Sequence, residues 1–198
     1  MPKREGLWHR AGVRIIAGSA GRMAIRVPRG VTRPTTDFVR QAVFSRLGER
    51  VEGARVLDLF AGSGAMGLEA LSRGAASCEF VEMNRGAVAV IRENLEKCRL
   101  EGGVVTMADA HAWLKRATGK FDLVFADPPY AKSRLDRDHL RELLESERAA
   151  GLLAEGGYWV VEQSSDWPTS EAVGLDCVDR REYGGSAILL YAAKGGGL

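Results

Sequence analysis

Between residues 54 and 162, short runs of apolar residues alternate with segments in which apolar residues recur at helical spacing. Five short runs are almost continuously apolar, which is typical of parallel strands buried on both faces; they cover residues 55–60, 77–83, 104–107, 121–126 and 158–162. Between these runs apolar residues recur at helical spacing, and the helices expected there cover residues 64–73, 84–98, 110–117 and 135–150. The alternation predicts an α/β fold with a doubly wound, mostly parallel sheet and helices on both faces.

The N-terminal segment has a different pattern, in which two short apolar runs flank a turn. Residues 13–17 and 23–27 lie on either side of Gly18-Ser19-Ala20-Gly21, so they predict a hairpin. Thr35 or Thr36 is then suited to cap a helix, because apolar residues at helical spacing follow. A small hairpin followed by a helix is therefore expected ahead of the sheet.

The C-terminal segment predicts a second hairpin. Residues 175–182 and 187–193 are apolar-rich runs around Tyr183-Gly184-Gly185, so we expect an antiparallel strand at one end of the sheet. Together, the patterns divide the chain into a basic hairpin-and-helix extension over residues 1–50 and a main α/β domain over residues 51–194.

The composition is that of a globular protein. Of the 198 residues, 45% are apolar and 27% are charged, which argues against a disordered chain or a coiled coil. The longest apolar run has seven residues, whereas a membrane span needs about 20, and the polar, basic first residues do not resemble a secretory signal. The three cysteines and three histidines are scattered. We therefore expect a reducing, cytoplasmic location, no disulfide framework and no zinc site.

Positive charge is concentrated near the N-terminus. Residues 1–46 carry a formal charge of +8 and the rest of the chain carries −6; nine of the ten basic residues in the segment are arginines, which suit phosphate groups. The segment predicts a polyanion-binding surface, and an ordinary solvated surface explains the charge run alone equally well. We expect the turn at 18–21 to project basic side chains beside the carboxyl edge of the sheet. The candidate contacts are Arg10, Arg14, Arg22, Arg26 and Arg33.

A glycine-rich loop follows the first strand of the main domain. Gly62, Gly64 and Gly67 satisfy G-x-G-x-x-G between a strand and a helix, and Glu82 stands 20 residues after Gly62 at the end of the next strand. Glycines let the backbone approach a ligand closely, and an acid at that position accepts hydrogen bonds from ribose hydroxyls. The pattern indicates a cofactor with an adenosine moiety. By itself it does not separate a nicotinamide dinucleotide from S-adenosylmethionine.

A second site motif follows the apolar run 121–126. That strand delivers Asp127 to the carboxyl edge of the sheet, where Pro128, Pro129 and Tyr130 follow. The prolines have no N–H group and an ionised aspartate only accepts hydrogen bonds, so the motif suits a donor such as an amino group. Tyr130 offers a ring that can stack on a planar base. The motif therefore predicts a site for an amino-bearing base.

Several segments resemble those of known methyltransferases. Asp127-Pro128-Pro129-Tyr130 resembles the catalytic motif of amino-methyltransferases that act on exocyclic nitrogens of bases, and residues 58–64 resemble their S-adenosylmethionine loop. Residues 14–18, 33–37 and 67–73 resemble signatures of the RsmD family. Members of that family methylate N2 of one guanine in 16S ribosomal RNA with S-adenosylmethionine.

The resemblance covers about residues 13–193 and departs from the family pattern at two positions. Phe38 stands where a basic residue is common, and Asn84 stands where aspartate is usual, although asparagine caps a helix equally well. The resemblance implies a class I methyltransferase fold with a seven-stranded Rossmann-like sheet and a small N-terminal hairpin. It also implies a monomeric enzyme that needs no metal and acts on 16S ribosomal RNA in the small subunit or an assembly intermediate.

The resemblance further implies roles for individual residues. Those expected to hold the target base are Asp127, Pro128, Pro129 and Tyr130. Those expected to hold the cofactor are Thr35, Thr36, Asp37, Asp58, Phe60, Gly62, Gly64, Glu82, Asp109 and Ala110. The five arginines named above become candidate RNA contacts.

Three alternatives stay open. A nicotinamide-dependent oxidoreductase would share the glycine loop but has no use for the motif at Asp127. A DNA amino-methyltransferase would share that motif but usually carries a target-recognition domain, and only about 50 residues precede this sheet. A non-catalytic RNA-binding module would explain the basic segment but needs neither site motif.

Overall fold

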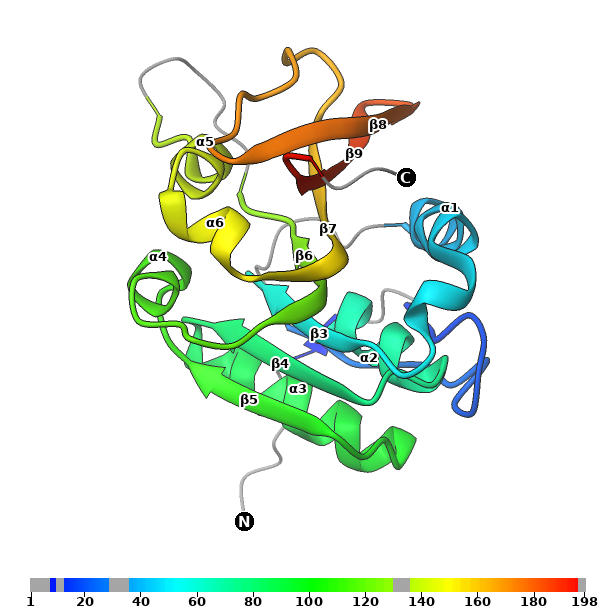
Figure 1. Cartoon of the computed structure of the whole chain (residues 1–198). Coiled ribbons are helices and arrows are strands. Elements are labelled where there is room, and N and C mark those ends of the chain that lie inside the picture. Colours follow the sequence, from blue (N-terminus) through cyan, green and yellow to red (C-terminus); the bar gives the residue numbers. More distant parts are fainter. Residues whose placement is uncertain (1–7, 10–12, 29–35, 130–135, 196–198) are drawn as a thin grey trace.

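Seven strands of the computed structural model form one sheet, in the order β5-β4-β3-β6-β7-β9-β8 (Figure 1). They are β3 (Arg55–Leu59), β4 (Ser77–Glu82), β5 (Gly103–Met107), β6 (Phe121–Ala126), β7 (Leu153–Ser164), β8 (Leu175–Tyr183) and β9 (Ser186–Ala193). Neighbouring strands are parallel except at β9, which runs antiparallel to both β7 and β8. The structure describes residues 8–9, 13–28, 36–129 and 136–195.

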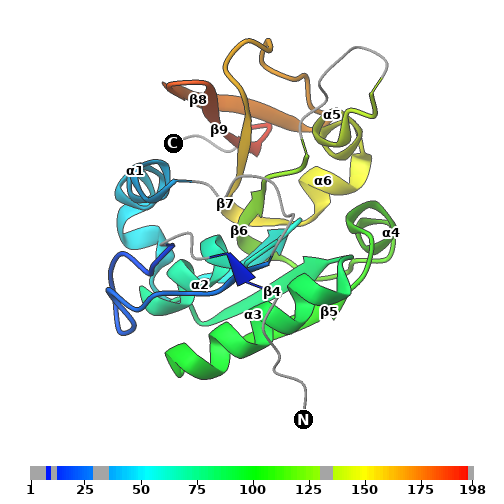
Figure 2. The same ribbon diagram turned by 180° about the vertical axis from the view of Figure 1, so that it is seen from behind.

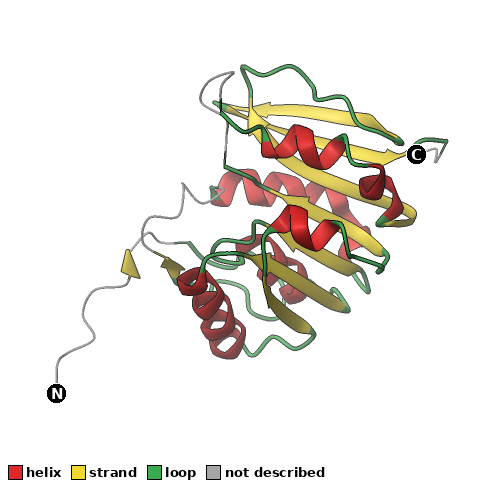
Figure 3. Cartoon of the chain, turned by 90° about the vertical axis from the view of Figure 1, so that its left-hand side faces the viewer, coloured by secondary structure: helices red, strands yellow, loops and turns green. Residues whose placement is uncertain are grey.

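Helices cover both faces of this sheet, as predicted (Figures 2 and 3). One face carries α1 (Asp37–Leu47), α2 (Ala65–Ser72) and α3 (Arg85–Cys98), and the other carries α4 (Ala110–Leu114), α5 (His139–Leu144) and α6 (Glu147–Gly151). A short 3-10 helix, Gly48–Val51, follows α1. In the part of the chain that the structure describes, no helix is long and apolar enough to cross a membrane.

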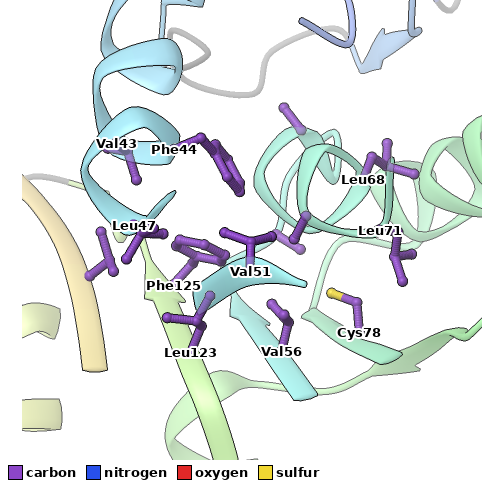
Figure 4. Packing of buried hydrophobic residues seen from close by; sticks show 14 of the residues in the cluster. Val43, Phe44, Leu47, Val51, Val56, Leu68, Leu71, Cys78, Leu123 and Phe125 are labelled. Atoms are coloured by element: carbon purple, nitrogen blue, oxygen red, sulfur yellow. The ribbon is translucent and has the colours of Figure 1, made fainter. Parts of the chain in front are cut away.

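The strands separate the buried side chains into two cores. Val56 packs with the residues under α1, α2 and α3, whereas its neighbour Leu57 packs with those under α4, α5 and α6, because successive residues of a strand point to opposite faces. Figure 4 shows the first core, where Phe44 of α1 lies against Phe125 of β6 with ring centroids 5.6 Å apart. Both faces of the central strands are therefore covered, which explains their continuous apolar runs.

Most predicted elements are confirmed, with two corrections. The prediction of one helix over residues 135–150 is wrong, because the described part of this range forms two helices, α5 and α6. The second helix starts after Ser146, whose hydroxyl accepts from the Arg148 N–H at 3.3 Å. The antiparallel strand lies one position in from the sheet edge, because the closing hairpin places β9 between β7 and β8. A two-residue pair, β1 (Trp8–His9) with β2 (Val27–Pro28), had no signal in the sequence.

The N-terminal hairpin forms as predicted but packs closely on α2. The Ile15 N–H donates to the Met23 carbonyl at 2.9 Å, and the Ile25 N–H donates to the Val13 carbonyl at 2.9 Å. The carboxylate of Glu69, which is 0% exposed on α2, accepts from the N–H groups of Ile16 and Ala17 at 2.7 and 3.1 Å. These bonds fix the hairpin to the body of the protein.

The position of the hairpin's turn corrects one expectation. The Ser19 N–H donates to the carbonyl of Ser72, the last residue of α2, at 2.7 Å, so the turn at 18–21 lies near the amino ends of the strands. The open end lies toward the carboxyl edge, since Asn94 accepts from the Arg26 N–H and donates to the carbonyl of Ser63 in the glycine loop. The turn therefore does not project arginines beside that edge.

Tight packing between α2 and β4 gives a first prediction. A Cβ atom at Gly67 would lie 2.3 Å from the Phe80 ring and 2.5 Å from the Cys78 sulfur. We expect Gly67→Ala to lower the free energy of unfolding by about 1–3 kcal/mol, because the buried neighbours must move. Gly151→Ala is the control, since nothing lies within 4 Å of that position. Urea denaturation that finds Gly67→Ala as stable as the control would contradict this packing.

Candidate active site

The two sequence motifs meet at the carboxyl ends of β3 and β6. These strands are neighbours, with Leu59 opposite Ala126, so the glycine loop and Asp127 leave the sheet side by side. The chain moves from β3 outward through β4 and β5 and then returns to β6 on the other side of β3. Such a switch in strand order opens a crevice at the carboxyl edge, where doubly wound sheets bind their ligands.

The glycine loop is hydrogen-bonded to Glu82, the acid predicted to bind ribose. Gly62 and Gly64 have φ values of +55° and +78°, which glycine adopts without strain. The Glu82 carboxylate accepts from the Gly62 N–H at 2.9 Å and from the Asn84 N–H at 2.7 Å. A carboxylate offers about four acceptor positions. Glu82 therefore connects the loop to the start of α3 and keeps acceptor capacity for hydroxyl groups.

Asp58 is a buried carboxyl group beneath this loop. It is 4% exposed, and it accepts from the Gly67 N–H at 3.0 Å. Burial raises the pKa of Asp58 to about 8 against the lowering effect of the Gly67 hydrogen bond, and the charge of Glu82 raises it further. At neutral pH the carboxyl group therefore holds its proton in most molecules.

Three acidic residues line one small cavity at the edge. Asp58 and Glu162 lie near the carboxyl ends of β3 and β7, and Asp127 follows β6. The remaining walls are apolar: Val43, Met66, Phe125, Ala126, Val160, Val161 and Ile188. Acids with little competing solvent favour a ligand that is cationic or rich in donors. The sequence motifs do not include Glu162, although an acid at the end of the strand expected over residues 158–162 was the available signal.

The two prolines after Asp127 border a second cavity. Pro128 and Pro129 line it together with the end of β7 and the loop that follows, and Glu162 lines both cavities. The remaining residues around it are Asp138, Leu140, Gln163, Ser164, Trp167 and Ser170. The motif at Asp127 therefore separates an acidic cavity from one with polar and aromatic walls.

The start of α1 is fixed beside the site. The Thr36 hydroxyl accepts from the Val39 N–H at 3.3 Å, which confirms the predicted cap. Asp37 pairs with the Arg14 guanidinium at 3.3 Å and with fully buried Arg40 at 2.8 Å. Burial lowers the pKa of Arg40, and Asp37 opposes that effect. Asp37 therefore serves first to join α1 to the hairpin.

The predicted adenine-binding residues lie beside a histidine pair. Asp109 caps α4 by accepting from the Ala112 N–H at 2.9 Å, and Ala110 is buried. Phe60, with φ +57°, directs its ring toward the stacked rings of His111 and His139, whose Nε2 and Nδ1 atoms lie 2.9 Å apart. Burial, with a smaller contribution from the Arg137 charge, lowers the pKa of His111.

The arginine candidates divide between the two ends of the hairpin. Arg14 and Arg26 lie toward the carboxyl edge, where they pair with Asp37 and Glu93, respectively. Arg22 lies next to the turn at the opposite end, with φ +71°. Four of the predicted site residues lie outside the described part of the chain, namely Arg10, Arg33, Thr35 and Tyr130. Among the described residues, no group of three or more histidine, cysteine or acidic side chains is arranged to hold a metal ion.

Comparison with known proteins agrees with these motifs. The family described as Conserved hypothetical protein 95 matches residues 13–192. Ribosomal RNA small subunit methyltransferase D of Escherichia coli K12 is 34% identical over 160 residues, which are 80% of this chain and 75% of that protein. The chain belongs to the RsmD family.

Two further relatives cover nearly the whole of this RsmD-family chain. YlbH of Bacillus subtilis, named provisionally as an rRNA methyltransferase, is 37% identical over 190 residues, which are 92% of this chain and 100% of that protein. The solved structure of the E. coli protein YhhF, named provisionally as a methyltransferase, is 32% identical with a TM-score of 0.74, over 91% of this chain and 97% of that one. The predicted family and the class I Rossmann-like methyltransferase fold are confirmed.

The raised pKa of Asp58 predicts an unusual pH dependence. Between about pH 4 and pH 8 the folded protein keeps the Asp58 proton that the unfolded chain releases, so Asp58 contributes stability below pH 4 that is lost as pH rises through 8. Asp58→Asn cannot titrate at this position, so the variant should not lose this stability. We expect the free energy of unfolding of the variant minus that of wild type to increase from pH 5 to pH 8 and then to level off. Urea denaturation at a series of pH values measures the difference.

Asp122→Asn on β6 is the control for this prediction. A hydrogen bond from Arg55 lowers the pKa of Asp122, so the difference between this variant and wild type should be flat from pH 5 to pH 8. A flat difference for Asp58→Asn as well would show that Asp58 is ionised in the folded protein.

Proposed function

We propose that this chain transfers a methyl group from S-adenosylmethionine to the exocyclic N2 atom of one guanine in 16S ribosomal RNA. The substrate is the small ribosomal subunit or an assembly intermediate, and the enzyme acts as a cytoplasmic monomer. Membership of the RsmD family makes the chain a methyltransferase of ribosomal RNA. The observation that carries the finer proposal is the junction of β3 and β6, where the glycine loop with Glu82 adjoins the motif at Asp127.

The residues at the junction fit S-adenosylmethionine. Glu82 retains acceptor positions for the ribose hydroxyls, and Gly62 and Gly64 present backbone without side chains beside it. Asp58 and Glu162 line the acidic cavity, and a bound cation favours release of the Asp58 proton, so the cavity suits the cationic methionine portion. Asp109 and Ala110 are proposed to meet the adenine, and Thr35, Thr36 and Asp37 the methionine end. When bound, the cofactor supplies a methyl group already activated by its sulfonium, so the protein's task is placement.

Asp127 and the Pro128 carbonyl are proposed to hold the target amino group. The lone pair of the guanine N2 is delocalised into the ring, which makes the amino group a poor nucleophile. If these two acceptors each accept a hydrogen bond from the amino group, they favour a pyramidal nitrogen. The lone pair of that nitrogen then points at the methyl group. Correct placement contributes up to about 7–11 kcal/mol when the atoms are near attack geometry. After the amino nitrogen has taken the methyl group, it loses one proton to Asp127 or to water.

The target base must leave its stack to reach this edge. Tyr130 and Pro129 are proposed to replace part of the lost stacking, as in other enzymes that act on unstacked bases.

The direct test of the proposed function incubates small-subunit particles with methyl-labelled S-adenosylmethionine and maps the modified nucleotide. We expect one N2-methylguanine in 16S RNA. A label on another base atom or on large-subunit RNA would contradict the proposal.

Substitution of Asp127 should lower turnover, whereas substitution of Glu82 should weaken cofactor binding. Asp127→Ala should lower kcat by about 100-fold or more and change S-adenosylhomocysteine affinity by only a few fold, because Asp127 is assigned to the base. Glu82→Ala should weaken S-adenosylhomocysteine binding by about 1–3 kcal/mol in calorimetry, because it loses charged hydrogen bonds. Asp122→Asn, on the strand that leads to Asp127, should resemble wild type in both measurements. Near wild-type turnover of Asp127→Ala would refute its role.

The arginines should contribute unequally to RNA binding. Replacing Arg14 and Arg26 by alanine should weaken binding to small-subunit RNA and reduce the salt slope, by about 0.7–0.9 log units per lost phosphate contact per log unit of salt. Arg22→Ala should have a smaller effect, because Arg22 lies at the other end of the hairpin. Equal effects of the two variants in filter binding would contradict the placement of RNA at the carboxyl edge.

A further inference from the structure

Gln163 carries a buried acceptor that has no hydrogen-bond partner in the part of the chain that the structure describes. The residue is 5% exposed at the end of β7, and its Oε1 atom has no hydrogen-bond partner. Among the described residues, the other buried side-chain nitrogen and oxygen atoms without a partner are two nitrogens of Arg40. A buried acceptor without a partner costs about 1–3 kcal/mol, so its retention calls for an explanation.

The orientation of the Gln163 amide is fixed by its own nitrogen. Nε2 donates to the carbonyls of Trp167 and Pro168 at 3.0 and 3.1 Å, and carbonyls only accept, so the oxygen cannot exchange places with the nitrogen. Arg180 holds the loop that contains Trp167 and Pro168, because its guanidinium donates to the carbonyls of Trp167 and Ser165 at 3.1 and 3.0 Å. The unpaired oxygen is therefore held in place and is not a mobile surface group.

Gln163 lies next to the motif proposed to hold the target base. It lines the same cavity as Pro128 and Pro129, together with the half-buried Trp167. Glu162 joins this cavity to the one lined by Asp127. A base whose amino group reached Asp127 and Pro128 would present its adjoining edge to this second cavity.

We propose that Gln163 Oε1 accepts the N1–H of the target guanine and so makes the site specific for that base. The inference rests on the proposed function, and it names a specificity residue for that site. Guanine carries N1–H directly beside its N2 amino group, whereas adenine and 2-aminopurine have an unprotonated N1. A guanine therefore satisfies the buried oxygen, and a base without N1–H leaves it unpaired, which strongly disfavours binding.

An ordered water that satisfies Oε1 is the competing explanation, and it predicts no dependence on the N1 proton. The experiment compares small-subunit particles that carry guanine or 2-aminopurine at the mapped position. Both bases present the 2-amino group, and only guanine presents N1–H. We expect the wild-type kcat/KM to be about 10- to 100-fold lower for 2-aminopurine. Equal rates on the two bases would overturn the inference without any variant.

Gln163→Leu completes the test, because leucine has similar volume and no acceptor. The ratio of kcat/KM for guanine to that for 2-aminopurine should fall toward one in this variant, while S-adenosylhomocysteine affinity stays within a few fold. Gln41→Leu is the matched control, since Gln41 is exposed on α1 and should leave the ratio unchanged. A ratio that persists in Gln163→Leu would show that the site reads the missing O6 atom of 2-aminopurine and not N1–H.

The outcomes separate this inference from the proposed function. N2-methylation of guanine with an unchanged base ratio refutes the role of Gln163 alone. Labelling of a base other than guanine refutes the proposed function and, with it, the assignment of Gln163. If Gln163→Leu unfolds, the wild-type comparison still tests the inference, because equal rates on guanine and 2-aminopurine would overturn it.

Discussion

The alignment of β3 beside β6 is the constraint on which the site depends. Leu59 lies opposite Ala126, so the loop that begins at Phe60 and the motif that begins at Asp127 start at the same level of the sheet. Both strands are buried on both faces, and a slip of one residue would turn apolar side chains to the wrong face. The core therefore sets the distance between the cofactor loop and the base-binding motif, although more than 60 residues separate them in the chain.

Electrostatics then divides the protein into two functional surfaces. At the switch point, Asp58, Asp127 and Glu162 surround one cavity, and burial keeps a proton on Asp58 near neutral pH. A bound cation would favour release of that proton, so cofactor binding and the charge of the site are coupled. Positive charge lies instead on the hairpin, where Arg14 and Arg26 flank the same edge. An acidic interior with basic neighbours suits a cationic cofactor and a polyanionic substrate.

Much of this arrangement was predictable from the sequence, because local patterns carried it. The continuous apolar runs identified the parallel strands, and Asn84 identified the start of α3 by its capping oxygen, which accepts from the Ala87 N–H at 3.0 Å. The G-x-G-x-x-G spacing placed Glu82 at the loop, and the structure joins them directly through the Gly62 N–H. Such features depend on residues close together in the chain, or on the general rule that places a ligand-binding loop and an acid at the carboxyl ends of adjacent parallel strands.

Features that depend on distant contacts were not predictable. The position of the hairpin turn follows from Ser72 and Glu69 on α2, which no local pattern linked to residues 16–19. The division of the expected helix at 135–150 follows from the Ser146 cap, which competed with an uninterrupted apolar period. The unpaired oxygen of Gln163 could be recognised only after its amide nitrogen was found bonded to the loop that follows β7.

A crystal structure with S-adenosylhomocysteine bound tests the central claim most directly, because that claim is spatial. The account predicts the ribose hydroxyls within hydrogen-bond distance of Glu82 and the sulfur atom facing Asp127 across the junction of β3 and β6. Clear density for the ligand elsewhere on the protein, or at the glycine loop with its sulfur turned away from Asp127, would contradict it.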